Sequence, residues 1–181
     1  MMKLVFTRTE KLELEGLLYT NSKSPQFQKL LRTNKKLLVF ILIGFAIILF
    51  FFNKQLSLLI TIVGAIAVII FPRFQRWFYW RSFKKLIKAD EHKNLFGEQF
   101  TVTFEGNYLE IVGSMASSKH NYDNFSYVSE TIDNIFIKLI VGNYLVFPKD
   151  QIKDLPEFLD YIQGFCSDHS LQYIDDRHWR W

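Results

Sequence analysis

The feature that most constrains this chain is an apolar run from Leu37 to Phe71, interrupted once by the polar triplet "NKQ" at positions 53–55. One helix of these 35 residues would be about 52 Å long, against roughly 30 Å of bilayer hydrocarbon, so a single straight span cannot use the run. Asparagine is a turn former, and a lysine at mid-membrane is costly. The triplet therefore predicts the tip of a tight transmembrane hairpin whose two helices cover residues 36–52 and 56–72.

A hairpin buried in a soluble core is the alternative. Two adjacent helices that are apolar all round would need a large surrounding protein to cover them, and the rest of this 181-residue chain is small. Small residues in both helices predict that the helices approach each other closely in lipid. These residues are Gly44 and Ala46 in the first helix and Ser57, Thr61, Gly64 and Ala65 in the second.

Basic residues flank the apolar run on both sides, whereas its interruption carries Lys54 alone. The positive-inside rule then places both termini in the cytoplasm and predicts a two-span protein of the cytoplasmic (inner) membrane. Basic and aromatic residues beside the spans are expected at the membrane interface, in contact with anionic headgroups. They are Lys35, Lys36, Arg73, Arg76, Trp77, Trp80, Arg81, Lys84 and Lys85.

The net charge of +4 conceals two oppositely charged regions. Residues 23–93 hold 13 basic and 2 acidic residues, a net +11, and residues 94–181 hold 6 basic and 13 acidic, a net −7. Attraction of about 1 kcal/mol per basic residue to an anionic lipid surface accounts for the basic region without nucleic acid. Because the acidic region would repel phosphate backbones, the sequence predicts no nucleic-acid partner.

Before the apolar run, "KLVF" reads as a short strand. Thr7 and Glu10 fit a capping box, which predicts a helix from Arg8 to Tyr19. The segment "NSKSP" at 21–25 predicts a break, and a second helix is expected to run from Pro25 into the membrane. Pro72 is expected to mark the exit from the hairpin.

From Gln99 the apolar pattern changes to period two and predicts about six short strands joined by tight turns. Asp154 and Glu157 then frame the start of an amphipathic helix, "LPEFLDYIQGFC". We therefore expect an α+β membrane protein in which the transmembrane hairpin is joined to a small antiparallel β domain, a barrel or strongly bent sheet, capped by a C-terminal helix. The expected segments are an N-terminal strand and helix at 1–35, the hairpin at 36–72, a basic interfacial linker helix at 73–93, the cytosolic β domain at 94–166 and a tail at 167–181.

Several stretches of this pattern resemble a known family. "FTVTFEGNYLEIV", "HNYDNFSYVSETIDNIFI" and "NYLVFPKDQI", following two adjacent apolar helices, are similar to the YcxB-like membrane proteins of bacteria. The resemblance implies a cytosolic domain like the bacterial pleckstrin-homology-like domains, with the "KLVF" strand added to it. It carries over to Tyr122, where the family usually has Trp, and to Asp123, Phe125, Pro148 and Lys149. It implies an architecture and a location rather than a reaction.

Residues suited to catalysis or metal binding are few. The sequence has no glycine-rich phosphate loop and no serine nucleophile elbow. Cys166 and His169 could form half of a zinc site, with His178 and Asp175 or Asp176 nearby, but a small buried cysteine beside a solvated tail explains them as well. We expect no cofactor, no metal and no enzymatic activity.

The sequence thus favours a membrane-anchored interaction protein whose cytosolic domain binds a protein, peptide or lipid at an edge or groove of its sheet. Two alternatives stay open: an immunity or regulatory protein acting on another membrane protein or a membrane-active toxin, and an enzyme built around Cys166 and His169. The oligomeric state is open, and a homo-oligomer is compatible with the sequence. The tail "DDRHWRW" could be flexible, could return to the membrane or could pack on the domain or a partner.

Overall fold

The computed structural model describes residues 2–89, 96–114 and 116–181 of the chain. It is an α+β protein that divides into two compact units. The sheet unit comprises Met1–Thr20 and Ile87–Trp181, and the helical unit comprises Asn21–Leu86. The expected cytosolic domain at 94–166 is therefore too short at both ends, because the N-terminal strand and helix and the C-terminal tail belong to the same unit as the sheets.

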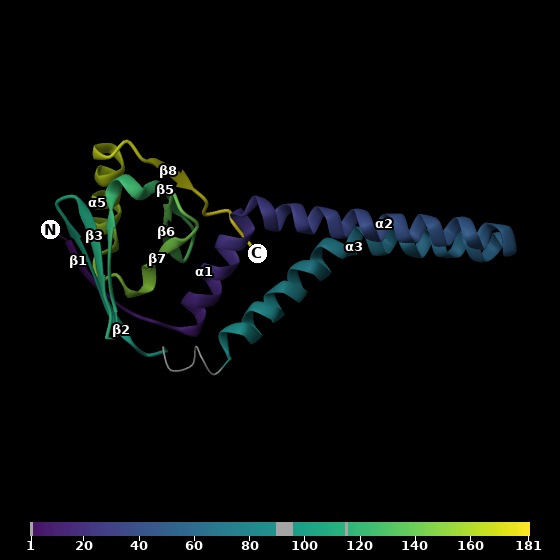
Figure 1. Ribbon diagram of the computed structural model, residues 1–181, viewed down its shortest axis with the longest axis horizontal. Helices are drawn as coiled ribbons and strands as arrows, with labels where there is room; N and C mark the ends of the chain where they lie inside the picture. The colour runs from purple at the N-terminus through teal and green to yellow at the C-terminus, as the bar shows by residue number, and fades with distance from the viewer. Residues whose placement is uncertain (1, 90–95, 115) are drawn as a thin grey trace. The chain divides into compact units, whose positions relative to one another are not determined.

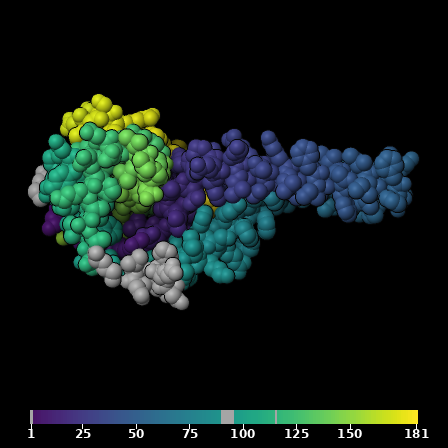
Figure 2. All heavy atoms as spheres, in the orientation of Figure 1, coloured from purple at the N-terminus to yellow at the C-terminus, as the bar shows by residue number. Residues whose placement is uncertain are grey.

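The helical unit contains two long apolar helices, α2 (Pro25–Phe52) and α3 (Lys54–Ile87), which lie side by side (Figures 1 and 2). Asn53 alone separates them: its amide donates to the carbonyl of Leu49, and its Oδ1 accepts hydrogen bonds from the amides of Gln55 and Leu56. One residue thus caps the end of α2 and the start of α3. The turn occurs within the expected triplet, but Lys54 and Gln55 are helical.

Part of the predicted small-residue packing occurs between these helices. The hydroxyl of Ser57 donates to the carbonyl oxygen of Ala46 across the helix pair at 2.9 Å, and a Cβ on Gly64 would lie 3.4 Å from the side chain of Leu42. Gly44 and Ala65 take no such part, since a Cβ on Gly44 would meet open space and Ala65 is exposed. The hydroxyl of Thr61 bonds to Ser57 O within its own helix.

The expected helix boundaries need three corrections. Pro72 lies inside α3 and not at its end, so residues 73–87 continue the second helix and form no separate linker. Residues 88 and 89 of the expected linker form a turn after α3, and 90–93 lie outside the described residues. Helix α1 spans Glu10–Lys23 and is capped by Thr9, whose Oγ1 accepts from the amide of Leu12, because Thr7 is held in a strand. The break after α1 shrinks to Ser24, whose hydroxyl oxygen accepts from the amide of Phe27 and caps α2.

The sheet unit contains two four-stranded sheets rather than one bent sheet. The first has the order β1-β2-β3-β4, all antiparallel, and the second the order β7-β6-β5-β8, in which β8 joins β5 in parallel. The strands are β1 (Met2–Thr7), β2 (Gln99–Glu105), β3 (Tyr108–Val112), β4 (Ser117–Asn121), β5 (Phe125–Glu130), β6 (Asn134–Leu139), β7 (Tyr144–Pro148) and β8 (Gln172–Asp175). The "KLVF" segment does add a strand, β1, beside β2.

The core of the sheet unit lies between the two sheets and is closed by helix α5 (Leu155–Asp168). Phe104 of β2, Phe147 of β7 and Phe158 of α5 meet there at ring-centre distances of about 6 Å. The predicted helix start is confirmed, since Asp154 accepts a hydrogen bond from the amide of Glu157. Two short 3₁₀ turns, Tyr122–Asn124 and Lys149–Gln151, precede β5 and α5.

Candidate functional site

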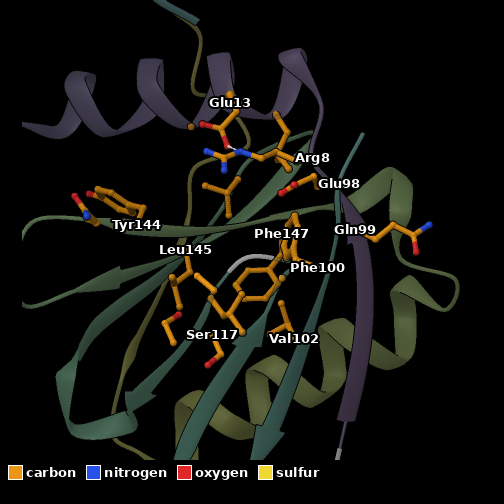
Figure 3. Close-up of a pocket in the computed structure, with 18 of the residues that line it drawn as sticks. Arg8, Glu13, Glu98, Gln99, Phe100, Val102, Ser117, Tyr144, Leu145 and Phe147 are labelled. Atoms are coloured by element: carbon orange, nitrogen blue, oxygen red, sulfur yellow. Dashed lines mark hydrogen bonds and ion pairs between the residues drawn. The ribbon is translucent and has the colours of Figure 1, made fainter. Parts of the chain in front are cut away.

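A groove of about 680 Å³ opens in the sheet unit between the two sheets and α1 (Figure 3). We call it the β7 groove, because strand β7 contributes residues from both of its faces: Tyr144 and Val146 from one, Leu145 and Phe147 from the other. Pockets of 300–1,000 Å³ with a mainly apolar lining are typical ligand sites. The remaining lining comes from α1, from β2 to β4 and from the turns beside them.

One wall of the β7 groove is α1, which packs on the face of the second sheet that points away from the core. The ring of Tyr19 stacks on that of Phe136 with centres 3.9 Å apart. A Cβ on Gly16 would lie 3.3 Å from Cγ2 of Val146, so the missing side chain at this position lets α1 approach β7 closely. Leu12 and Leu17 of α1 extend this wall.

The opposite wall is the core-facing side of the first sheet. Phe100 and Val102 of β2 supply apolar surface (Figure 3), as does Ile111 of β3, and Ser118 of β4 pairs directly with Ile111 across the strands. Edge strand β4 therefore turns this wall polar on one side. An apolar wall with a polar margin suits a ligand that is itself amphipathic.

Ionisable groups of the β7 groove lie together at one end. Arg8 Nε donates to Glu13 Oε1 at 2.6 Å, and the carboxylate of Glu98 accepts from the hydroxyl of Ser114 at 2.9 Å. The Arg8 amide also donates to the Glu98 carbonyl at 2.9 Å, which holds the two segments together. Because one cation faces two carboxylates, this end of the groove is weakly acidic.

The C-terminal tail packs on the sheet unit, which answers the question that its sequence left open. The fully buried Tyr19 places its hydroxyl 2.6 Å from Asp176 Oδ2 and 2.7 Å from Ser129 Oγ. Having a single proton, this phenol donates to the carboxylate, and burial together with this bond raises its pKa above the ordinary value. The Trp179 ring lies edge-on to Tyr19 with centres 5.2 Å apart.

The residues carried over from the family resemblance have structural positions. Tyr122 and Phe125 are buried, and the Tyr122 hydroxyl donates to the carbonyl of Glu105, while Asp123 is exposed. Lys149 follows Pro148 at the end of β7 and forms a largely buried ion pair with Glu130. None of the five lines the β7 groove.

The Lys149–Glu130 pair joins β5 to the segment after β7, and Tyr173 of β8 adds a hydroxyl 2.7 Å from Glu130 Oε2. Burial opposes ionisation of Glu130, but the hydrogen bonds from Lys149 and Tyr173 outweigh it and lower the pKa of this carboxyl. A carboxylate with both oxygens engaged by protein donors holds strands together and is not placed to act as a free acid or base.

The nine expected membrane-interface residues all lie on α2 and α3. Two cation–aromatic pairs form between residues four apart on α3: the Arg81 guanidinium carbon lies 5.1 Å from the ring centre of Trp77, and Lys84 Nζ lies 5.1 Å from that of Trp80. These pairs combine an amphipathic ring with a long basic side chain, as residues at headgroup level do.

Cys166 and His169 lie in different surroundings. Cys166 lies in the core, where burial raises the pKa of its thiol to about 11, and the imidazole of His169 packs against the rings of Tyr122 and Phe165. Within residues 2–89, 96–114 and 116–181, no group of three or more His, Cys, Asp or Glu side chains could hold a metal ion. A protonated, buried thiol is a poor nucleophile.

Sequence reasoning missed the β7 groove and the Tyr19–Asp176 contact. The groove joins Leu12, Phe100 and Tyr144, which are distant along the chain, so no local pattern marks it. One signal was available. Gly16 lies within a segment whose neighbouring residues favour a helix, and it marks the position where α1 approaches β7.

Comparisons of the chain with protein-family models, curated proteins and solved structures give no match. The likeness to YcxB-like proteins therefore stays a prediction from the quoted motifs.

Proposed function

We propose that this protein is a membrane-anchored interaction protein without enzymatic activity. In this proposal α2 and α3 cross the cytoplasmic membrane as a hairpin, both termini lie in the cytoplasm, and the sheet unit binds a partner protein at the inner membrane face. The single observation that carries the binding role is the β7 groove, which has apolar walls and a polar margin.

The surfaces of α2 and α3 support the membrane anchor. Both helices are long and apolar enough to cross a membrane. Large apolar side chains point outward along them, among them Phe40, Phe51 and Phe52, which are 72%, 81% and 83% exposed. At about 1.5 Å per residue the 28 and 34 residues reach beyond roughly 30 Å of hydrocarbon, so the basic ends extend into the headgroups.

The orientation follows from the distribution of basic residues along the helices. Lys54 stands alone at the Asn53 turn, whereas the other ends of α2 and α3 carry Lys35, Lys36 and the basic cluster from Arg73 onward. The positive-inside rule places that cluster, and with it the sheet unit, in the cytoplasm. There the cluster attracts anionic headgroups.

Two antiparallel-rich sheets with a C-terminal helix packed into their core are compatible with a pleckstrin-homology-like domain. Phosphoinositide-binding relatives of that fold use basic strand loops, and the turn between β2 and β3, Gly106–Asn107, has no lysine or arginine. A protein ligand in the β7 groove agrees better with this surface. Anchoring confines the groove to a thin layer beside the membrane and raises its effective concentration for partners there.

Site-specific photo-crosslinking in intact cells tests the proposal. A photoreactive amino acid at Ser117, exposed at the β7 groove, should give a discrete adduct with a second protein, whereas the same label at Ser126 on β5, exposed outside the groove, should not. Equal adducts from both positions, or none from Ser117, would reject a groove-bound partner.

A parallel measurement tests the anchor. A single reporter cysteine in place of Lys54, with Cys166 replaced by serine, should react with a membrane-impermeant reagent from outside the cell. A cytosolic Lys54 position, or a full-length chain that stays in solution without detergent, would reject the hairpin.

A further inference from the structure

Strand β7 differs from the other edge strands of the two sheets. Of the four edge strands that the structure describes, β1 carries Lys3, β4 carries Lys119 and β8 carries Asp175, while β7, "YLVFP", has no charged residue. Charges on an edge strand discourage pairing with another chain. Two of these edge strands, β4 and β7, line the groove, and of the two only β7 lacks a charged residue.

The hydrogen-bonding pattern shows which groups of β7 face the groove. The amide of Leu139 donates to the carbonyl of Asn143, which makes these two residues a hydrogen-bonded pair at the β6–β7 turn. In an antiparallel ladder such pairs alternate, so Leu145 and Phe147 bond to β6, and Tyr144 and Val146 direct their amide and carbonyl groups away from it.

The groove lies where a further strand of the second sheet would lie. Both faces of β7 line it, with α1 on one side and the first sheet on the other (Figure 3). A segment placed there would have the outward backbone groups of Tyr144 and Val146 at its side. Its alternate side chains would point to Leu12 and Leu17 of α1 and to Phe100 of β2.

We propose that the partner contributes an extended segment that pairs with β7 as an added strand. This inference deepens the proposed function, on which it rests, by naming the class of ligand. Because both walls of the groove are apolar, the centre of the segment carries uncharged, mainly apolar side chains on both faces. The end of the segment near Glu13 and Glu98 tolerates a basic residue.

An extended peptide satisfies this site better than a helix or an acyl chain. Either of those would leave the outward amide and carbonyl groups of β7 without partners while excluding water from them, and an unmade buried hydrogen bond is costly. Strand addition takes its affinity from these main-chain groups and its specificity from alternate side chains.

The test uses the full chain in lipid nanodiscs. Binding peptides are selected from phage-displayed random dodecapeptides, and the affinity of the selected peptides is then measured by fluorescence anisotropy. Val146→Pro removes one amide that points into the groove and spares the ladder to β6, a placement at which an edge strand tolerates proline. Peptide affinity should fall about tenfold or more. Val146→Thr keeps the amide and the branched shape, and should lose much less peptide affinity than Val146→Pro does.

Peptides N-methylated at alternate residues keep the proposal testable if Val146→Pro does not fold. Methylation in one register should abolish binding and in the other should spare it. Binding indifferent to both registers, or no enriched peptide at all, would overturn strand addition. If the Ser117 crosslink in cells forms equally in a folded Val146→Pro chain, strand addition fails while the proposed function stands. If no Ser117 crosslink forms in the parent chain, the proposed function itself is rejected.

Discussion

Replacement of Tyr19 by phenylalanine tests how the N-terminal helix is joined to the C-terminal tail. Tyr19→Phe keeps the ring that stacks on Phe136 and removes the hydroxyl shared with Ser129 and Asp176. Ser129 is fully buried, so its hydroxyl loses a partner that water cannot replace. A hydrogen bond to a charged group contributes about 1.5–3 kcal/mol, and we expect a loss of about 2 kcal/mol.

Hydrogen exchange of the full chain in nanodiscs measures this loss locally. The expected 2 kcal/mol corresponds to about 30-fold faster exchange of the amides in α1 and β8, because Tyr19 lies on α1 and its partner Asp176 directly follows β8. Tyr108→Phe is the matched control: its hydroxyl bonds to Glu105 on the first sheet, away from α1 and β8. Exchange in α1 and β8 that is unchanged in Tyr19→Phe, or raised as much in Tyr108→Phe, would refute the argument.

Four further predictions concern the sheet unit. Lys149→Met leaves the carboxylate of Glu130 buried without its cation and should destabilise the unit by about 3 kcal/mol in denaturant titrations, a loss that Lys149→Arg should reduce. Because the folded-state pKa of Glu130 is lowered from 4.5, its contribution to the stability of the sheet unit is present above pH 4.5 and should be lost as the pH falls below it. Thermal unfolding across pH 3–6 would show or disprove this loss. The pKa values of Tyr144 and Tyr173 are raised from 10, mainly by burial, so their neutral forms stabilise the unit below pH 10 and this stability should decline above it; a flat profile to pH 11 would contradict the burial argument. Asp154→Ala removes the N-cap of α5 and should cost about 1 kcal/mol, against no change for Asp154→Asn.

Local patterns predicted the elements of this protein well. The polar triplet located the turn between two apolar helices, because a long apolar run with one polar interruption is compatible with few other arrangements of helices. Period-two alternation located β2, and the Asp154 cap located α5, since both signals reside in adjacent residues. The helix predicted from Arg8 was displaced, because strand pairing held Thr7 and moved the cap to Thr9.

Pro72 shows the limit of a local rule. Proline ends many helices because it lacks an amide donor, yet α3 continues through it. Contacts between α2 and α3 persist beyond this point, with Gln75 Nε2 3.5 Å from the carbonyl oxygen of Leu31 and the rings of Phe27 and Tyr79 4.8 Å apart. Packing against a neighbouring helix thus outweighs one missing hydrogen bond.

The sequence by itself determined where the apolar helices turn, where most of the strands run and how charge is divided along the chain, because these properties depend on neighbouring residues. Only the tertiary structure decided that the tail pairs with β5, that Tyr19 meets residues 110 and 157 positions away, and that the edge of β7 borders a groove. Such contacts depend on how separate segments pack in three dimensions, and no single segment contains that information.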